Sequence, residues 1–103
     1  MKKLVTLLLL TLLPLVASSQ KTAISGIYYS LDLWSDVKTA TVMSNPDKYS
    51  GDINIPSTVT YNDVTYSVTS IDVRAFQECG GLTSVVIPES VTYIGESAFS
   101  GCI

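Results

Sequence analysis

The stretch "AFQECGGL" (75–82) is followed by "AFSGCI" (98–103), so the chain begins to repeat itself. Ala75 of the first copy corresponds to Ala98 of the second, and we call this spacing the short offset. Six pairs of residues at the short offset are identical: Val68 and Val91, Thr69 and Thr92, Ile71 and Ile94, Ala75 and Ala98, Phe76 and Phe99, Cys79 and Cys102. A fixed period of 23 residues, as between Ala75 and Ala98, is typical of stacked units. Each such unit buries its apolar face against its neighbour.

A fainter repeat lies upstream. "INIPSTVTY" (53–61) resembles "VVIPESVTY" (85–93), and we call the spacing between these two stretches the long offset. The difference between the offsets indicates an insertion between Val59 and Val68, which contains "TYNDVTYSV". Its two runs of Val, Thr and Tyr predict strands, and Asn62-Asp63 between them predicts a tight hairpin turn because both residues tolerate a positive φ. The first unit is therefore expected to be elongated by a β-hairpin.

Two short runs before this unit are rich in β-branched and aromatic residues. "GIYYSLDL" (26–33) and "TATVM" (39–43) predict two strands of an N-terminal cap, and 44–52 is expected to be a loop. The aromatic residues of this part are Tyr28, Tyr29, Trp34, Tyr49, Tyr61 and Tyr66. We expect them to cover the open end of the stack, and a sugar-binding aromatic platform is the alternative.

The pattern within one unit distinguishes an inner and an outer face. Leu82, Val85 and Ile87 are expected to point inward, while the side chains between them point outward. The outward residues that are candidates for ligand binding are Asn54, Thr83, Ser84 and Val86. The predicted core consists of Ile53, Ile55, Ile71, Ala75, Phe76, Cys79, Leu82, Val85, Ile87, Val91, Ile94, Ala98, Phe99 and Cys102.

The stretch "LTSVVIPESVTYIGESAFSGC" (82–102) closely resembles the BspA-type leucine-rich repeat, a 23-residue unit of bacterial surface proteins. "YSGDINIPSTVTYNDVTYSVTSI" (49–71) is similar to the segment that precedes such arrays. The resemblance implies a mostly β fold, a leucine-rich-repeat solenoid that forms a right-handed superhelix of 23-residue coils after a β-hairpin cap. It also implies surface display, adhesion and protein recognition, with no catalytic residues. One departure is Asp72, which stands where the family has a glycine.

Residues 1–19 have the features of a secretory signal peptide. Lys2 and Lys3 precede an apolar run at 4–16, and the small residues at 17–19 follow it. A spanning helix needs about 20 apolar residues. Because the run is shorter, we expect export, to the medium or the cell surface, with no membrane span after cleavage. The predicted cap then covers 20–48 and the repeats 49–103, divided into an elongated first unit (49–70), a full repeat (71–93) and a partial repeat (94–103).

Charge and composition exclude several classes of function. Without the signal peptide, four basic residues stand against nine acidic ones, which argues against a nucleic-acid partner. The chain has no histidine, the commonest general base and metal ligand. The aspartates do not have the spacing of a calcium loop, and no nucleophile or phosphate-binding motif occurs. We therefore predict a protein that is not an enzyme and that binds no metal or cofactor.

The two cysteines, Cys79 and Cys102, occupy the same position of successive units. Export would permit a disulfide between them. Stacked units would instead place the two side chains parallel, which suits the dihedral angle of a disulfide poorly, so a ladder of buried thiols is favoured.

The expected partner is a protein or a cell-surface ligand. Self-association is a second expectation, through the open C-terminal face of the stack, where the partial repeat leaves Phe99 uncovered. A further hypothesis is that the chain is a truncated capping fragment of a longer repeat protein, with no activity of its own.

Overall fold

The structure is a computed structural model that describes residues 21–102; the predicted signal peptide at 1–19 lies outside this range. The described part contains strands and turns but no helix, and so no helix of the length and hydropathy needed to cross a membrane. The strands are β1 (Thr22–Ile24), β2 (Ile27–Leu31), β3 (Thr39–Val42), β4 (Gly51–Asn54), β5 (Thr58–Tyr61), β6 (Val64–Ile71), β7 (Leu82–Val86) and β8 (Tyr93–Ile94).

The N-terminal part is an antiparallel meander of β1, β2 and β3. The two strands predicted for this part are confirmed as β2 and β3. The short β1 was not predicted; it pairs with β2 across a turn at Ser25 and Gly26, which have φ angles of 51° and 87°. Positive φ at both central residues gives the turn a twist that matches the twist of the paired strands.

The predicted hairpin in the elongated unit is formed by β5 and β6. Tyr61 pairs with Val64, and the two residues between them, Asn62 and Asp63, have φ angles of 51° and 65°. The turn is therefore the tight two-residue kind that Asn and Asp favour because they tolerate this backbone conformation.

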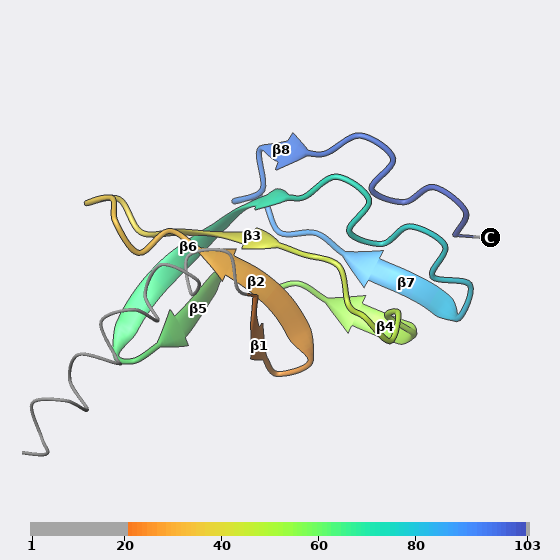
Figure 1. The fold of residues 1–103 in the computed structure, drawn as a ribbon, viewed down its shortest axis with the longest axis horizontal. Coiled ribbons are helices and arrows are strands. Elements are labelled where there is room, and N and C mark those ends of the chain that lie inside the picture. The colour runs from red at the N-terminus through yellow and green to blue at the C-terminus, as the bar shows by residue number, and fades with distance from the viewer. Residues whose placement is uncertain (1–20, 103) are drawn as a thin grey trace, which may run out of the picture.

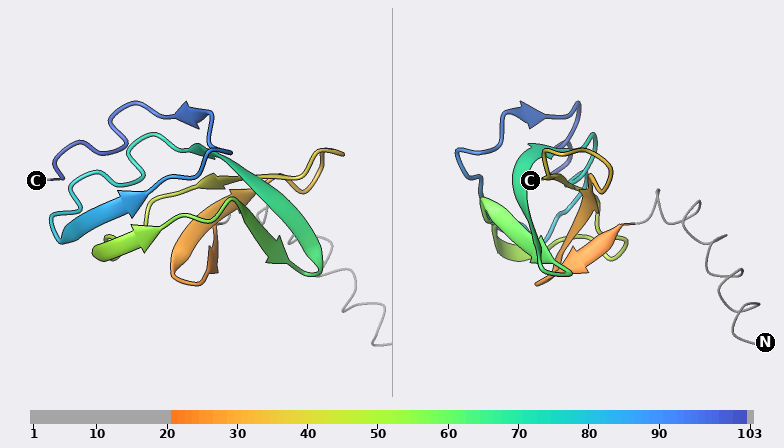
Figure 2. Two further views of the ribbon diagram at one scale, coloured as in Figure 1. Left: turned by 180° about the vertical axis from the view of Figure 1, so that it is seen from behind. Right: turned by 90° about the vertical axis from the view of Figure 1, so that its left-hand side faces the viewer.

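Beyond the hairpins, the chain winds into stacked coils (Figures 1 and 2). We name them coil 1 (39–57), coil 2 (68–90) and coil 3 (91–102). The strands β3, β6 and β8 pair in parallel, one from each coil, and β4 and β7 form a second parallel pair. Ile71 pairs with Ile94 and Ile53 with Val85, which confirms the short and the long offset as strand registers.

The turns that link the two strand columns also follow the repeat. The backbone N–H groups of Arg74, Phe76 and Glu78 donate to carbonyl groups of coil 3 at 3.1, 2.7 and 2.7 Å. Arg74 and Ser97, which are separated by the short offset, have φ angles of 57° and 60°, so the same unusual backbone conformation recurs. The turns thus extend the hydrogen bonding between coils beyond the strands. Figure 1 shows these turns as wavy segments that run side by side.

An aromatic column runs through the core of the stack. Phe76 is fully buried, with its ring centroid 4.7 Å from that of Tyr49 and 5.0 Å from that of Phe99. Tyr49 is therefore the coil 1 member of the column, although the sequence predicted only a loop there. Its hydroxyl donates to Met43 O at 2.7 Å and accepts from Tyr28 N at 3.0 Å, so the buried phenol is fully bonded.

Most of the predicted core is enclosed. The buried members are Ile55, Ile71, Ala75, Phe76, Cys79 and Ala98, and the half-buried ones are Ile53, Leu82, Val85, Val91, Phe99 and Cys102. The prediction is wrong for Ile87 and Ile94, which are 37% and 47% exposed. Their equivalents one coil earlier, Ile55 and Ile71, are buried, and the difference arises because no further strand covers β7 or β8 among residues 21–102.

The structure also changes the interpretation of the glycine after the repeat isoleucine. Gly95 and its equivalent one coil earlier, Asp72, both lack a positive φ, so the glycine is not needed for a left-handed backbone conformation. A Cβ at Gly95 would instead lie 2.4 Å from the backbone nitrogen of Val73. Glycine is needed here because the backbones of coils 2 and 3 approach closely.

Candidate functional site

The candidate site is the solvent-facing side of the β4–β7 pair, which we call the outer strand face. Its exposed side chains are Asp52, Asn54, Thr83, Ser84 and Val86. Alternation along β4 turns Ile53 toward the core and its two neighbours outward. All four predicted ligand-binding residues lie on this face, and Asn54 and Val86 are direct partners in the pairing of β4 with β7.

A β-bulge shapes the centre of this face. The register between the strands shifts so that Gly51 pairs with Leu82 but Asp52 pairs with Ser84, which leaves Thr83 as an extra residue. A bulge of this kind interrupts the alternation of a strand. Thr83 and Ser84 are consequently both exposed, and the next inward residue is Val85. The bulge explains why two outward positions, rather than one, separate the first two core residues of the repeat.

The two hydroxyl groups that the bulge exposes converge on one carboxylate. Thr83 Oγ1 donates to Asp52 Oδ1 at 2.6 Å, and Ser84 Oγ donates to the same oxygen at 2.8 Å. These donors lower the pKa of Asp52 because they stabilise its ionised form. The outer strand face therefore carries a negative charge, and within residues 21–102 no hydrogen bond reaches the second oxygen of this carboxylate.

Asp52 was missed as a site residue because it falls in the stretch 44–52, for which the sequence predicted a loop. The long offset already aligned Asp52 with Ser84, and this alignment was the signal in the sequence that could have identified Asp52 as a site residue.

The outer strand face combines the carboxylate of Asp52, the amide of Asn54 and the exposed aliphatic side chain of Val86. Such a set suits recognition of a protein surface, in which polar groups surround an apolar contact.

Within residues 21–102, no group of three or more metal-ligating side chains comes together. The cysteines lie at the turns, outside the β4–β7 pair. Cys79 is buried and Cys102 half-buried, both as free thiols, and Cys102 Sγ donates to Phe76 O at 2.7 Å.

The aromatic residues of the N-terminal part are divided between core and surface. Tyr29, Tyr49 and Tyr66 are 1–3% exposed and fill the interior, in line with the expectation that they cover the stack. Trp34 is 77% exposed on the loop between β2 and β3. These three buried rings have no face open to a sugar. They therefore cannot belong to the alternative sugar-binding platform, which leaves three of its six aromatic residues.

Comparison with solved structures finds the same architecture in bacterial proteins. The chain is similar to a leucine rich cell surface protein from Faecalibacterium prausnitzii A2-165, with 32% identity over 80% of this chain and a TM-score of 0.64. It is similar to a leucine-rich repeat protein from Bacteroides capillosus ATCC 29799, with 32% identity over 80% of this chain and a TM-score of 0.66. A third, a leucine-rich repeat protein from Bacteroides ovatus ATCC 8483, is 34% identical over 76% of this chain, with a TM-score of 0.60.

The chain spans only part of these structures, namely 21%, 59% and 20% of their lengths in the same order. A comparison with curated proteins finds no match. Residues 52–103, half of the chain, match the profile of the BspA type leucine rich repeat region of six copies. With the stacked parallel coils and the repeat registers described above, this match establishes that the chain belongs to the BspA-type leucine-rich repeat family.

Proposed function

We propose that the chain is an exported, non-catalytic recognition module that binds a protein or cell-surface ligand through the outer strand face, in an adhesin-like role. The observation that carries the proposal is the convergence of Thr83 and Ser84 on Asp52 beside the exposed Asn54 and Val86. The description of the F. prausnitzii relative as a cell surface protein supports a location outside the cell. The lack of histidine and of nucleophile motifs supports a role without catalysis.

The test is binding of the purified chain to immobilised host matrix proteins and to whole host cells. Val86→Asp removes the exposed apolar contact, and Asn54→Ala removes the amide beside it. We expect either variant to weaken binding about tenfold or more, because central contacts dominate interface energies. Thr65→Ala, at an exposed position of β6, is the matched control. Equal binding by all four proteins would contradict a role for the outer strand face.

We also propose self-association through the uncovered side of coil 3. Tyr93 and Ile94 are 56% and 47% exposed there, beside Val73 at 42%. Exposed apolar side chains next to an edge strand favour pairing with a second chain. Light scattering over a concentration series tests this, and Ile94→Lys should shift the chain toward the monomer. A monomer at all concentrations would disprove it.

A further inference from the structure

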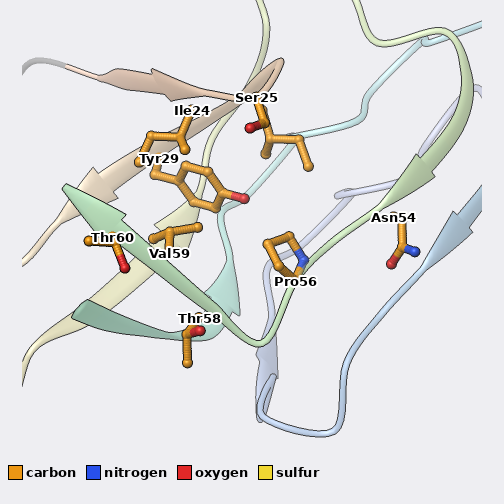
Figure 3. A pocket seen from close by; sticks show the side chains of 9 residues that line it. Ile24, Ser25, Tyr29, Asn54, Pro56, Thr58, Val59 and Thr60 are labelled. Carbon is orange, nitrogen blue, oxygen red and sulfur yellow. The ribbon is translucent and has the colours of Figure 1, made fainter.

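A hollow lies beside the N-terminal sheet, next to the outer strand face. It has a volume of about 580 Å³ and lies between the turn that joins β1 to β2, the strand β5, and the link at 54–58 (Figure 3). Ile24, Ile27 and Val59 supply its apolar lining, while Ser25, Thr58 and Thr60 contribute hydroxyl groups. None of the lining residues within 21–102 is charged, so a neutral or apolar occupant is favoured.

One edge of the hollow is a strand with unused backbone groups. β5 pairs with β6 on one side, and within residues 21–102 no strand pairs with its other side. Tyr61 and Val64 close the hairpin as a hydrogen-bonded pair, and such pairs alternate with non-bonded ones along an antiparallel ladder. Thr58 and Thr60 consequently direct their backbone N–H and C=O groups away from β6, toward the free edge.

The hydroxyl group of a buried tyrosine also faces the hollow. Tyr29 is 1% exposed as a whole residue and is one of the residues that line the hollow. Figure 3 shows this hydroxyl directed toward the space between Ser25 and Pro56. Burial raises the pKa of Tyr29 to about 12, so the group remains a proton donor at neutral pH. Tyr49, the other buried tyrosine with a raised pKa, does not line the hollow, and its hydroxyl is bonded to two backbone groups.

We propose that this hollow binds an extended peptide segment of a partner protein, which adds to the free edge of β5 as a strand and places apolar side chains in the hollow. The backbone of the segment pairs with Thr58 and Thr60, and one of its carbonyl oxygens accepts a hydrogen bond from the Tyr29 hydroxyl. An extended peptide fits both features, since only a chain backbone supplies the regular donors and acceptors that a free edge needs. The volume also suits a segment, because it falls within the range of ligand sites.

The test uses short capped peptides in which threonine alternates with valine, leucine or isoleucine, with lysine at both ends to complement the acidic chain. Titration of the purified chain, followed by NMR, should slow amide exchange at Thr58 and Thr60. The same peptides with fully N-methylated backbones should not bind, because they lack the donors that strand addition requires. If no peptide binds at millimolar concentration, the proposal is overturned.

Two variants locate the interaction. Thr60→Pro removes the outward N–H, at an edge position where proline is tolerated, and should abolish binding, whereas Thr60→Val should retain it. Tyr29→Phe should weaken binding about five- to tenfold, as expected for one hydrogen bond. Tyr66→Phe is its control, since Tyr66 is a buried tyrosine of the same sheet that does not line the hollow. Unfolding curves check that each variant is folded. If Thr60→Pro does not fold, the comparison with the N-methylated peptides decides the test.

Other outcomes identify other occupants and would overturn the proposal. Binding that survives Thr60→Pro in a folded chain would place the peptide elsewhere. Concentration-dependent protection of Thr58 and Thr60 without peptide would mean that a second copy occupies the edge. Saturable binding of a neutral sugar in the hollow, with no binding of peptides, would make it a carbohydrate site.

Discussion

At the scale of single residues, Tyr49 connects the aromatic column to the N-terminal meander. Its ring packs on Phe76, while its hydroxyl bonds to Met43 O and Tyr28 N. Tyr49→Phe keeps the ring but leaves a part-buried donor and acceptor unsatisfied. We expect a loss of about 1–3 kcal/mol in the free energy of unfolding, measured by urea denaturation. Tyr61→Phe, at an exposed tyrosine, should change it little, and an equal effect of both variants would contradict the role given to the Tyr49 hydroxyl.

The buried tyrosines also make stability depend on alkaline pH. Burial raises the pKa of Tyr29 and of Tyr49 from 10.0 to about 12. The folded chain therefore keeps two phenol protons that the unfolded chain loses near pH 10. The stability linked to these groups is fully present below pH 10 and is lost as the pH rises toward 12.

Urea midpoints recorded between pH 9 and pH 12 test this dependence. The decline should be shallower in Tyr29→Phe, which removes one of the two titrating groups. An unchanged slope in that variant would show that other groups dominate the alkaline transition.

At the scale of elements, the close approach of coils 2 and 3 depends on Gly95. Gly95→Ala would place a methyl group against backbone atoms of Asp72 and Val73, at 2.7 and 2.4 Å, and backbone cannot move aside as a flexible side chain can. We expect a loss of about 2–3 kcal/mol in the free energy of unfolding. Gly80→Ala is the control, since a Cβ there has open space and its φ is not positive. Similar effects of the two would argue against a close approach at Gly95.

The elements that the sequence predicted well are those that local chemistry defines. The Asn62-Asp63 turn requires only two residues that accept a positive φ, and the pairing of Ile71 with Ile94 follows from six identities at one offset. The parallel pairing of β3 with β6 was not predictable in this way. Its register, which places Val42 opposite Ile71, matches neither the short nor the long offset, because the connection from β3 to β4 is shorter than the equivalent connection from β6 to β7.

The site was predictable to a similar extent. Alternation along β4 and β7 identified the outward residues Asn54 and Val86, but it could not reveal the bulge that makes Thr83 and Ser84 share Asp52. The hollow beside β5 escaped prediction altogether. Its walls come from segments that are distant in sequence and have no repeat relationship, so only the folded sheet brings Ile24 and Val59 together.

At the scale of the whole molecule, the stack should lose stability from coil 3 inward. In a repeat protein each unit is stabilised by its contacts with its neighbours, so stability is nearly a sum of units and interfaces. Phe76 lies between two aromatic rings and is 0% exposed, whereas Phe99 is half-buried and, among residues 21–102, stacks on Phe76 alone. Amide exchange should therefore be fastest in 91–102, slower in coil 2, and slowest where β3 and β6 pair.

Matched truncations of the two phenylalanines test this gradient. Phe76→Ala should cost about 3–5 kcal/mol and unfold the stack as a whole, because it breaks the column between coils 1 and 2 as well as between coils 2 and 3. Phe99→Ala should cost less and accelerate exchange mainly in 91–102, leaving the protection of Val42 and Ile71 in place. If both variants accelerate exchange uniformly from β1 to β8, the chain unfolds as one cooperative unit, and the energetic independence of its coils is disproved.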